Sequence, residues 1–204
     1  GLNRAKLPGI PGLATFEGHS FHTSRWDYAY TGGDSSGGLT GLKDKRVGII
    51  GTGATAVQCV PHLGAGAKDL LVFQRTPSSV DVRNDRPTDP EWAKSLHHGW
   101  QRERMDNFTA GMSGAKFDVD LVQDGWTELS RRIREKIQVL PREQRSLENM
   151  RAAFEEADFE KMEEIRVRAE RIVHDYQTAQ KLKAWYRQLC KRPCLHDAYL
   201  QYYT

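Results

Sequence analysis

Cysteine is scarce in this chain, and long apolar runs are missing. The 204 residues include three cysteines, Cys59, Cys190 and Cys194, without the spacing of a disulfide framework, which indicates a reducing compartment. No apolar run approaches the roughly 20 residues that a membrane-spanning helix needs, and no secretory signal pattern is present. We therefore expect a cytoplasmic protein with no membrane association.

A metal-binding motif is also lacking. Cys190 and Cys194 lie four residues apart, with His196 as the nearest further donor. A zinc site needs about four ligands, so we interpret these cysteines as unpaired structural thiols and predict no metal site.

The chain has no strong excess of charge of one sign. Its 30 basic and 27 acidic residues leave a net charge of +3, whereas a nucleic-acid-binding protein concentrates basic charge far more strongly. The composition therefore argues against a nucleic-acid partner. The sequence gives no indication of the oligomeric state.

The first residues carry few signals of regular structure. Residues 1–15 contain two proline–glycine breaks and are predicted to be a linker. The glycine-rich residues 31–41 predict a flexible surface loop. Because the chain begins with Gly1 rather than Met, we expect it to start within a larger protein.

A strand, a turn, a helix and a second strand follow. Residues 46–50 and 69–73 are short, β-branched apolar runs typical of buried strands. Residues 57–63 predict a helix, although Pro61 lies inside it. Strand, turn, helix and strand within about thirty residues form a βαβ unit.

The turn after the first strand fits the dinucleotide-binding fingerprint G-x-G-x-x-G/A. Gly51 allows the tight turn, Gly53 lets the backbone approach a pyrophosphate, and Ala56 lets the helix pack close to the strand. Helix amides and the helix dipole would then bind the phosphates. The alternative is a glycine turn that binds no ligand. The predicted cofactor contacts are Gly51, Thr52, Gly53, Ala54, Thr55, Ala56 and Gln58.

The end of the second strand predicts which cofactor binds. An NAD site has an acidic residue there, whereas this chain has Arg75 followed by Thr76. A guanidinium can bind a 2′-phosphate bidentately, and the threonine can add a hydroxyl donor. We therefore predict NADP(H) rather than NAD(H). The alternative is an ordinary surface arginine.

The second half of the chain predicts an irregular stretch and then helices. Residues 77–125 are irregular, with a short helix near Trp92. Beyond them, apolar residues recur at helical spacing with charged residues between, which predicts about three helices whose apolar stripes are packing seams. The stripes are Trp126, Leu129, Ile133 and Ile137; Met162, Ile165, Ala169, Ile172 and Tyr176; and Leu182, Trp185, Tyr186 and Leu189.

One motif is far more specific than the glycine turn. The pattern F-x-G-x-x-x-H-x-x-x-W-(P/D) is matched by Phe16, Gly18, His22, Trp26 and Asp27. It is similar to the fingerprint of type I Baeyer–Villiger monooxygenases, whose N-hydroxylating and dimethylaniline-type relatives lack the tryptophan. The resemblance implies that His22 orders the junction of the FAD and NADP domains during catalysis. From the residues alone, His22 would be a structural histidine.

The resemblance continues near the end of the chain. Cys190-Lys-Arg-Pro193 resembles the point where the family's chain returns from a helical insertion. The resemblance implies that Lys191 helps to bind the 2′-phosphate and that Arg192 stabilises the flavin peroxide anion. A guanidinium stays cationic at any working pH and can stabilise charge in a water-poor pocket. From the residues alone, this basic pair would cap the last helix.

The resemblance implies an α/β fold, with a Rossmann-like NADP-binding domain and an all-helical insertion. Residues 1–15 would be the linker from a missing FAD domain, and 16–85 the NADP-binding βαβ region with the family fingerprint. Residues 86–190 would be the irregular loop and helical insertion. Residues 191–204 would return toward the NADP and FAD domains.

The implied function is oxygen insertion into ketones. The complete enzyme would use NADPH to reduce FAD and then O2 to convert a ketone to an ester or lactone. The family's FAD-binding G-x-G-x-x-G is absent and would lie before Gly1, so we expect this chain alone to be inactive. Two alternatives stay open: a flavin monooxygenase acting on nitrogen or sulfur, and a stand-alone NADP-binding module. The substrate cannot be read from the sequence.

Overall fold

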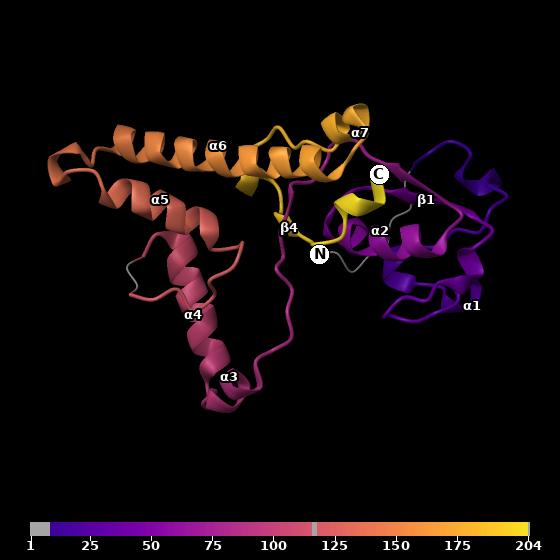
Figure 1. Cartoon of the computed structure of the whole chain (residues 1–204), viewed down its shortest axis with the longest axis horizontal. Coiled ribbons are helices and arrows are strands. Elements are labelled where there is room, and N and C mark those ends of the chain that lie inside the picture. The colour runs from indigo at the N-terminus through magenta and orange to yellow at the C-terminus, as the bar shows by residue number, and fades with distance from the viewer. Residues whose placement is uncertain (1–8, 116–117, 204) are drawn as a thin grey trace.

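The computed structural model describes residues 9–115 and 118–203, which form a mixed α/β fold rich in helix. Figure 1 shows an α/β part built around helix α2 (Ala54–Gly66) and, beside it, a helical arm. We use "helical arm" for residues 90–172, which contain α3 (Pro90–Ser95), α4 (Trp100–Ser113), α5 (Glu128–Gln138) and α6 (Leu147–Ile172).

A parallel two-stranded sheet and its crossover helix form the α/β part. Strands β1 (Arg46–Ile50) and β2 (Asp69–Phe73) pair in parallel, and α2 connects them. The inward residues of both strands pack with α2 in the main core, and the outward face leaves Ile50, Leu71 and Phe73 exposed. The predicted βαβ unit is confirmed, and its helix extends beyond the predicted residues 57–63 at both ends.

Helix α2 accommodates a proline in its interior. Pro61 is buried and lacks the N–H that would donate to the previous turn. The helix continues through it because Val57, Val60 and Leu63 are buried on the face that meets the sheet. Apolar burial on this face outweighs the lost hydrogen bond.

The segment before β1 differs from its prediction. Of the predicted linker, residues 9–15 are exposed and include a 3₁₀ turn at Leu13–Thr15 (η1), while residues 1–8 lie outside the described residues. The surface-loop prediction for 31–41 is wrong at both ends, because Thr31 and Leu39 are buried. Their burial follows from a short helix on each side, α1 (Tyr28–Thr31) and η3 (Thr40–Leu42).

The helical arm contains more helix than the sequence predicts. The short helix near Trp92 is confirmed as α3, and the first apolar stripe is confirmed as α5 except for Trp126, which precedes the helix. Helix α4 lies inside the stretch predicted to be irregular, so that prediction is wrong. Because α4 buries only Gly111 among its residues, it carries no apolar stripe from which a helix could be predicted.

The two later apolar stripes also require correction. The second begins on α6 but does not end there, since Tyr176 opens a separate helix, α7 (Tyr176–Lys181). The third prediction, a helix over residues 182–189, is wrong. Leu182, Ala184 and Gln188 are buried at even spacing, which is typical of extended chain, and only a 3₁₀ turn at Gln188–Cys190 (η5) follows.

The end of the chain returns to the α/β part. Strand β4 (Cys194–Leu195) pairs in parallel with β3 (Val80–Asp81), and its Cys194 N–H donates to the carbonyl of Ser79 at 3.1 Å. The final 3₁₀ helix, η6 (Leu200–Tyr203), buries Leu200 in the same core as α2. In Figure 1, β4 accordingly lies between the helical arm and α2.

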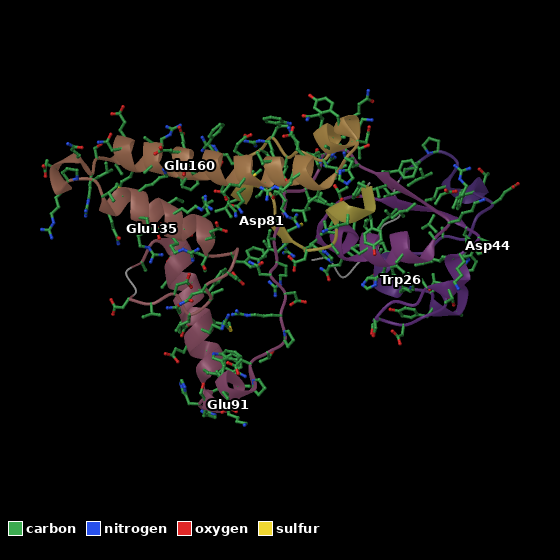
Figure 2. All side chains as sticks on the ribbon, viewed as in Figure 1. Trp26, Asp44, Asp81, Glu91, Glu135 and Glu160 are labelled. Atoms are coloured by element: carbon green, nitrogen blue, oxygen red, sulfur yellow. The ribbon has the colours of Figure 1, made fainter. Side chains whose placement is uncertain are left out.

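A buried ion-pair cluster joins the helical arm to β3. The Lys161 ammonium of α6 is 5% exposed and lies 2.6 Å from Asp81 Oδ2 and 2.8 Å from Glu128 Oε2. Arg132 of α5 binds Glu128 and also Glu164 of α6. Figure 2 labels Asp81 close to α6, on the side that faces the α/β part. The cluster therefore links three elements.

We expect Lys161→Ala to lower the free energy of unfolding of the 204-residue chain by about 3 kcal/mol, because the buried Asp81 carboxylate loses its ion-pair partner while Glu128 keeps only Arg132. Urea unfolding measures this loss. The matched control is Lys94→Ala, which breaks an exposed pair with Glu91 and should change stability by about 0.5 kcal/mol or less. Equal effects of the two substitutions on the free energy of unfolding would contradict the conclusion that Lys161 forms buried, stabilising ion pairs.

The same cluster predicts a pH dependence. Burial alone would raise the pKa of Glu128, but hydrogen bonds and charges from Lys161 and Arg132 lower the pKa below its ordinary value. Stability from a lowered carboxyl pKa is present above the unfolded-state value, about 4.3, and is lost as pH falls through the folded-state value. The stability difference between the wild type and Lys161→Ala should therefore shrink below about pH 4. A difference that is constant from neutral to acidic pH would refute this.

Candidate functional site

The glycine turn leaves open space at the start of α2. Gly51 has φ +103°, a conformation that favours glycine, and its N–H donates to the Phe73 carbonyl at 2.8 Å. Gly53 is the N-cap of α2, which has no side-chain cap. A Cβ added at Gly51 or Gly53 would meet no atom within 4 Å. A phosphate group could therefore approach this backbone closely.

Hydroxyl groups fix the turn to the segment that follows β2. Buried Thr52 donates from Oγ1 to the Thr76 carbonyl at 2.9 Å. Ser78 Oγ donates in return to the Thr52 carbonyl. These reciprocal bonds hold the turn in one position relative to residues 76–78, so a ligand on the turn would also meet that segment.

The remaining residues of the turn differ in exposure. Thr55 and Gln58 are exposed, Ala54 is half-buried, and Ala56 is buried against the sheet. The Gln58 amide donates to the Ala54 carbonyl at 3.2 Å. Gln58 would have to release this bond before its amide could donate to a ligand.

Arg75 lies between two anchored residues. The preceding Gln74 donates to the Lys181 carbonyl at 2.7 Å, and the following Thr76 accepts the bond from Thr52. Arg75 itself is exposed, and its guanidinium forms no hydrogen bond or ion pair with any residue that the structure describes. The backbone on both sides of Arg75 is therefore fixed at the carboxyl end of β2, and the Arg75 guanidinium is unpaired among the described residues.

Lys191 is placed near the same segment by an aromatic ring. Its Nζ lies 4.6 Å from the centroid of the Tyr186 ring. The hydroxyl oxygen of Tyr186 accepts the Ser79 N–H at 2.9 Å. Ser79 follows Ser78, which bonds the glycine turn. The turn, residues 74–79 and the Tyr186–Lys191 segment therefore lie together.

Arg192 stands at the entry to β4. Its side chain is exposed, and its carbonyl accepts the Cys194 thiol at 3.7 Å. Burial raises the pKa of the Cys194 thiol, while a hydrogen bond from Ser78 and the charge of Arg192 lower it in part.

Among the described residues, no contact connects His22 to the glycine turn, Arg75, Lys191 or Arg192. Its ring Nδ1 accepts the Ser24 N–H at 3.1 Å, at the start of the 3₁₀ turn Thr23–Arg25 (η2). The ring is exposed and forms no hydrogen bond with Arg192. In the chain as described, His22 is a capping residue, and its predicted role at a domain junction stays a prediction.

The other fingerprint residues make structural contacts. The Phe16 ring lies against Gly18, where an added Cβ would come within 2.4 Å of it. The Trp26 indole donates to Thr31 Oγ1 at 3.0 Å and packs on the main core, in the α/β part as Figure 2 shows. Asp27 caps α1 by accepting the Tyr30 N–H at 3.1 Å. These contacts give Phe16, Gly18, Trp26 and Asp27 structural roles in this chain.

Residues 9–115 and 118–203 contain neither a metal-binding cluster nor a membrane-spanning helix. No group of three or more His, Cys, Asp or Glu side chains in these ranges could hold a metal ion. Cys59, Cys190 and Cys194 are free thiols. In the same ranges no helix combines the length and the apolar character that crossing a membrane requires.

Sequence reasoning missed the residues that connect the site. Ser78, Ser79, Tyr186 and Lys181 were not predicted to belong to it. Ser78 and Ser79 could have been suspected from their place just after the strand end. Tyr186 and Lys181 each bond a residue 107 positions away, and no local pattern reports such a contact.

Comparisons with known proteins identify the class of this chain. No family model matches it. Neopentalenolactone D synthase of Streptomyces avermitilis is 61% identical over 205 residues, covering 100% of this chain and 34% of that protein. A Baeyer-Villiger monooxygenase of Stachybotrys chlorohalonatus is 59% identical, covering 96% of this chain and 31% of its own length.

Solved structures agree with the sequence comparison. Polycyclic ketone monooxygenase of Thermothelomyces thermophila has a TM-score of 0.79 and 45% identity, over 97% of this chain and 32% of that one. OTEMO, solved in complex with FAD and NADP, has a TM-score of 0.63 and 26% identity, over 98% of this chain and 37% of that one.

The relatives include proteins named Baeyer-Villiger monooxygenase and polycyclic ketone monooxygenase, in agreement with the resemblance found in the sequence. Over almost its whole length, the chain is homologous to one segment of the Baeyer–Villiger monooxygenases. It spans about a third of the length of the curated relatives that it matches.

Substitutions at the two glycines of the turn should differ in their effect on stability. Gly51→Ala forces a positive φ on a residue with a side chain and should lower the free energy of unfolding by about 1–2 kcal/mol. Gly53→Ser should leave stability within about 0.5 kcal/mol, because Gly53 has φ −72° and open space around it and serine is a favourable N-cap. Thermal and urea unfolding of the two variants measure both values. A larger loss for Gly53→Ser would contradict the geometry.

Proposed function

We propose that this chain is the NADPH-binding part of a flavin-dependent monooxygenase that inserts one oxygen atom of O2 into ketones to give esters or lactones. One observation carries the proposal: the open glycine turn at the start of α2 is hydrogen-bonded to the segment that follows exposed Arg75, and Tyr186, whose ring contacts exposed Lys191, bonds the same segment. The names of the homologues support the ketone chemistry. They favour it over the alternative of nitrogen or sulfur oxygenation.

The proposed architecture is a Rossmann-like NADP-binding domain with an all-helical insertion. The parallel β1–α2–β2 unit with the turn at its carboxyl edge supports this interpretation, since ligands of such folds bind at that edge. The pairing of β3 with β4 supports an insertion between residues 86 and 190, because the chain leaves and re-enters the α/β part at adjacent strands.

The residues of the turn would hold the pyrophosphate of NADP(H). The first amides of α2 and the helix dipole favour negative charge there, and the open space at Gly53 lets the phosphates reach them. Arg75 would bind the 2′-phosphate with its planar fork of donors, and Lys191 would add a point charge. Thr76 would add a hydroxyl donor.

The flavin would supply the redox chemistry. FAD, which OTEMO holds together with NADP, would carry out the oxidation when bound, after reduction by NADPH. Arg192 would contribute a permanent positive charge that stabilises developing negative charge near the flavin. His22 would form polar contacts at the junction between the two nucleotide-binding domains.

Substitution of Arg75 tests the proposal. Arg75→Ala should raise the dissociation constant for NADPH by about tenfold or more, because it removes a charged hydrogen-bonding group from the 2′-phosphate, and should leave NADH binding nearly unchanged. Fluorescence titration of the 204-residue chain with both cofactors measures this. The control is Arg46→Ala, the same change of charge at the opposite end of the sheet. Equal losses for NADPH and NADH would remove the case for 2′-phosphate recognition.

A further inference from the structure

One tyrosine lies between the predicted 2′-phosphate ligand and the segment after β2. The Tyr186 hydroxyl accepts the Ser79 N–H at 2.9 Å. The face of the same ring lies 4.6 Å from Lys191 Nζ. Tyr186 therefore contacts both the segment that begins with Arg75 and Thr76 and the segment that carries Lys191, which are separated by more than a hundred positions in the chain.

The Tyr186 ring also packs against the helical arm. It packs against the small buried cluster of Met162, Ile165 and Ala184. The extended segment around it is fixed at two further points. Buried Arg166 donates to the Ala184 carbonyl at 3.1 Å, and Asp158 accepts the Gln188 N–H at 2.9 Å. The ring therefore has little freedom to move.

Lys191 gains a defined position from this ring. A lysine ammonium at the end of a four-carbon stem has many rotamers in water, and ordering them costs entropy when a ligand binds. A cation over an aromatic face is attracted to it and restricted there. Lys191 remains exposed, so its ammonium can contact the ring and a phosphate at the same time.

We propose that Tyr186 is a positioning residue that sets the preference for NADPH over NADH by holding Lys191 beside the 2′-phosphate site. This inference rests on the proposed function. Tyr186 need not touch the cofactor, since it acts through Lys191. Its effect must therefore disappear when the lysine is absent.

A double-mutant cycle on the 204-residue chain tests this coupling. Dissociation constants for NADPH and NADH are measured by fluorescence titration for Tyr186→Leu, Lys191→Ala and the double variant. Tyr186→Leu should lower the NADPH preference about two- to fivefold and leave NADH binding unchanged. In the Lys191→Ala background it should lower the preference no further. Tyr176→Leu, at an exposed tyrosine of α7, is the matched control and should have no effect.

A second comparison keeps the test informative if Tyr186→Leu does not fold. Phenylalanine at position 186 retains the ring, and trifluorophenylalanine retains its shape but removes the negative face that attracts a cation. The phenylalanine variant should keep the NADPH preference within about twofold, and the fluorinated ring should lose it as Tyr186→Leu does. Equal preferences for the two rings would overturn the inference.

The outcomes separate the inference from the proposed function. If Lys191→Ala leaves the NADPH preference intact, the role proposed for Lys191 fails, and the inference fails with it. If Lys191→Ala lowers the preference and Tyr186→Leu does not, only the inference fails. Additive losses in the double variant would also overturn it, because they would show that Tyr186 acts independently of Lys191.

Discussion

The parallel pairing of β3 with β4 is the constraint on which the rest of the site depends. Two backbone bonds, from Cys194 to Ser79 and from His196 to Asp81, bring the end of the chain back beside the strand-end segment. This pairing fixes the start of the segment after Arg192 relative to residues 79–81. The site is therefore assembled from two parts of the sequence that this small sheet holds together, along with the Gln74–Lys181 and Ser79–Tyr186 bonds.

The helical arm stabilises that pairing with buried charge. Arg168 of α6 donates to the carbonyls of Val80 and His196, one on each side of the paired strands. Burial lowers the pKa of Arg168, and the charges of Asp81 and Asp197 oppose this effect. Lys161, about two turns earlier on the same face of α6, binds Asp81 itself. The helical arm, which lies between β3 and β4 in the sequence, thus supplies the cations that fix the two strands, so the arm and the site are parts of one structure.

Much of the α/β part could be predicted from the sequence, because its signals are local. The βαβ unit follows from apolar runs and a glycine turn within about thirty residues, and the fingerprint around Trp26 indicates the family. The extended chain at residues 182–189 could not be predicted, since Leu182, Trp185, Tyr186 and Leu189 also fit helical spacing. Burial against α6 decides between the two conformations, and that contact is not local. Helix α4 was missed for the opposite reason, because it buries almost nothing.

The site residues also divide into those with a local sequence signal and those placed by contacts between distant parts of the chain. The turn residues and Arg75 were predicted from position alone, whereas Tyr186, Ser79 and Lys181 enter through contacts across 107 positions.

A crystal structure of the 204-residue chain with NADP+ tests the central claim most directly. The account predicts the pyrophosphate against the backbone of Gly53 and the first turn of α2, and the 2′-phosphate within hydrogen-bonding distance of Arg75 and Lys191. A cofactor bound elsewhere, or a 2′-phosphate directed away from both cations, would contradict it.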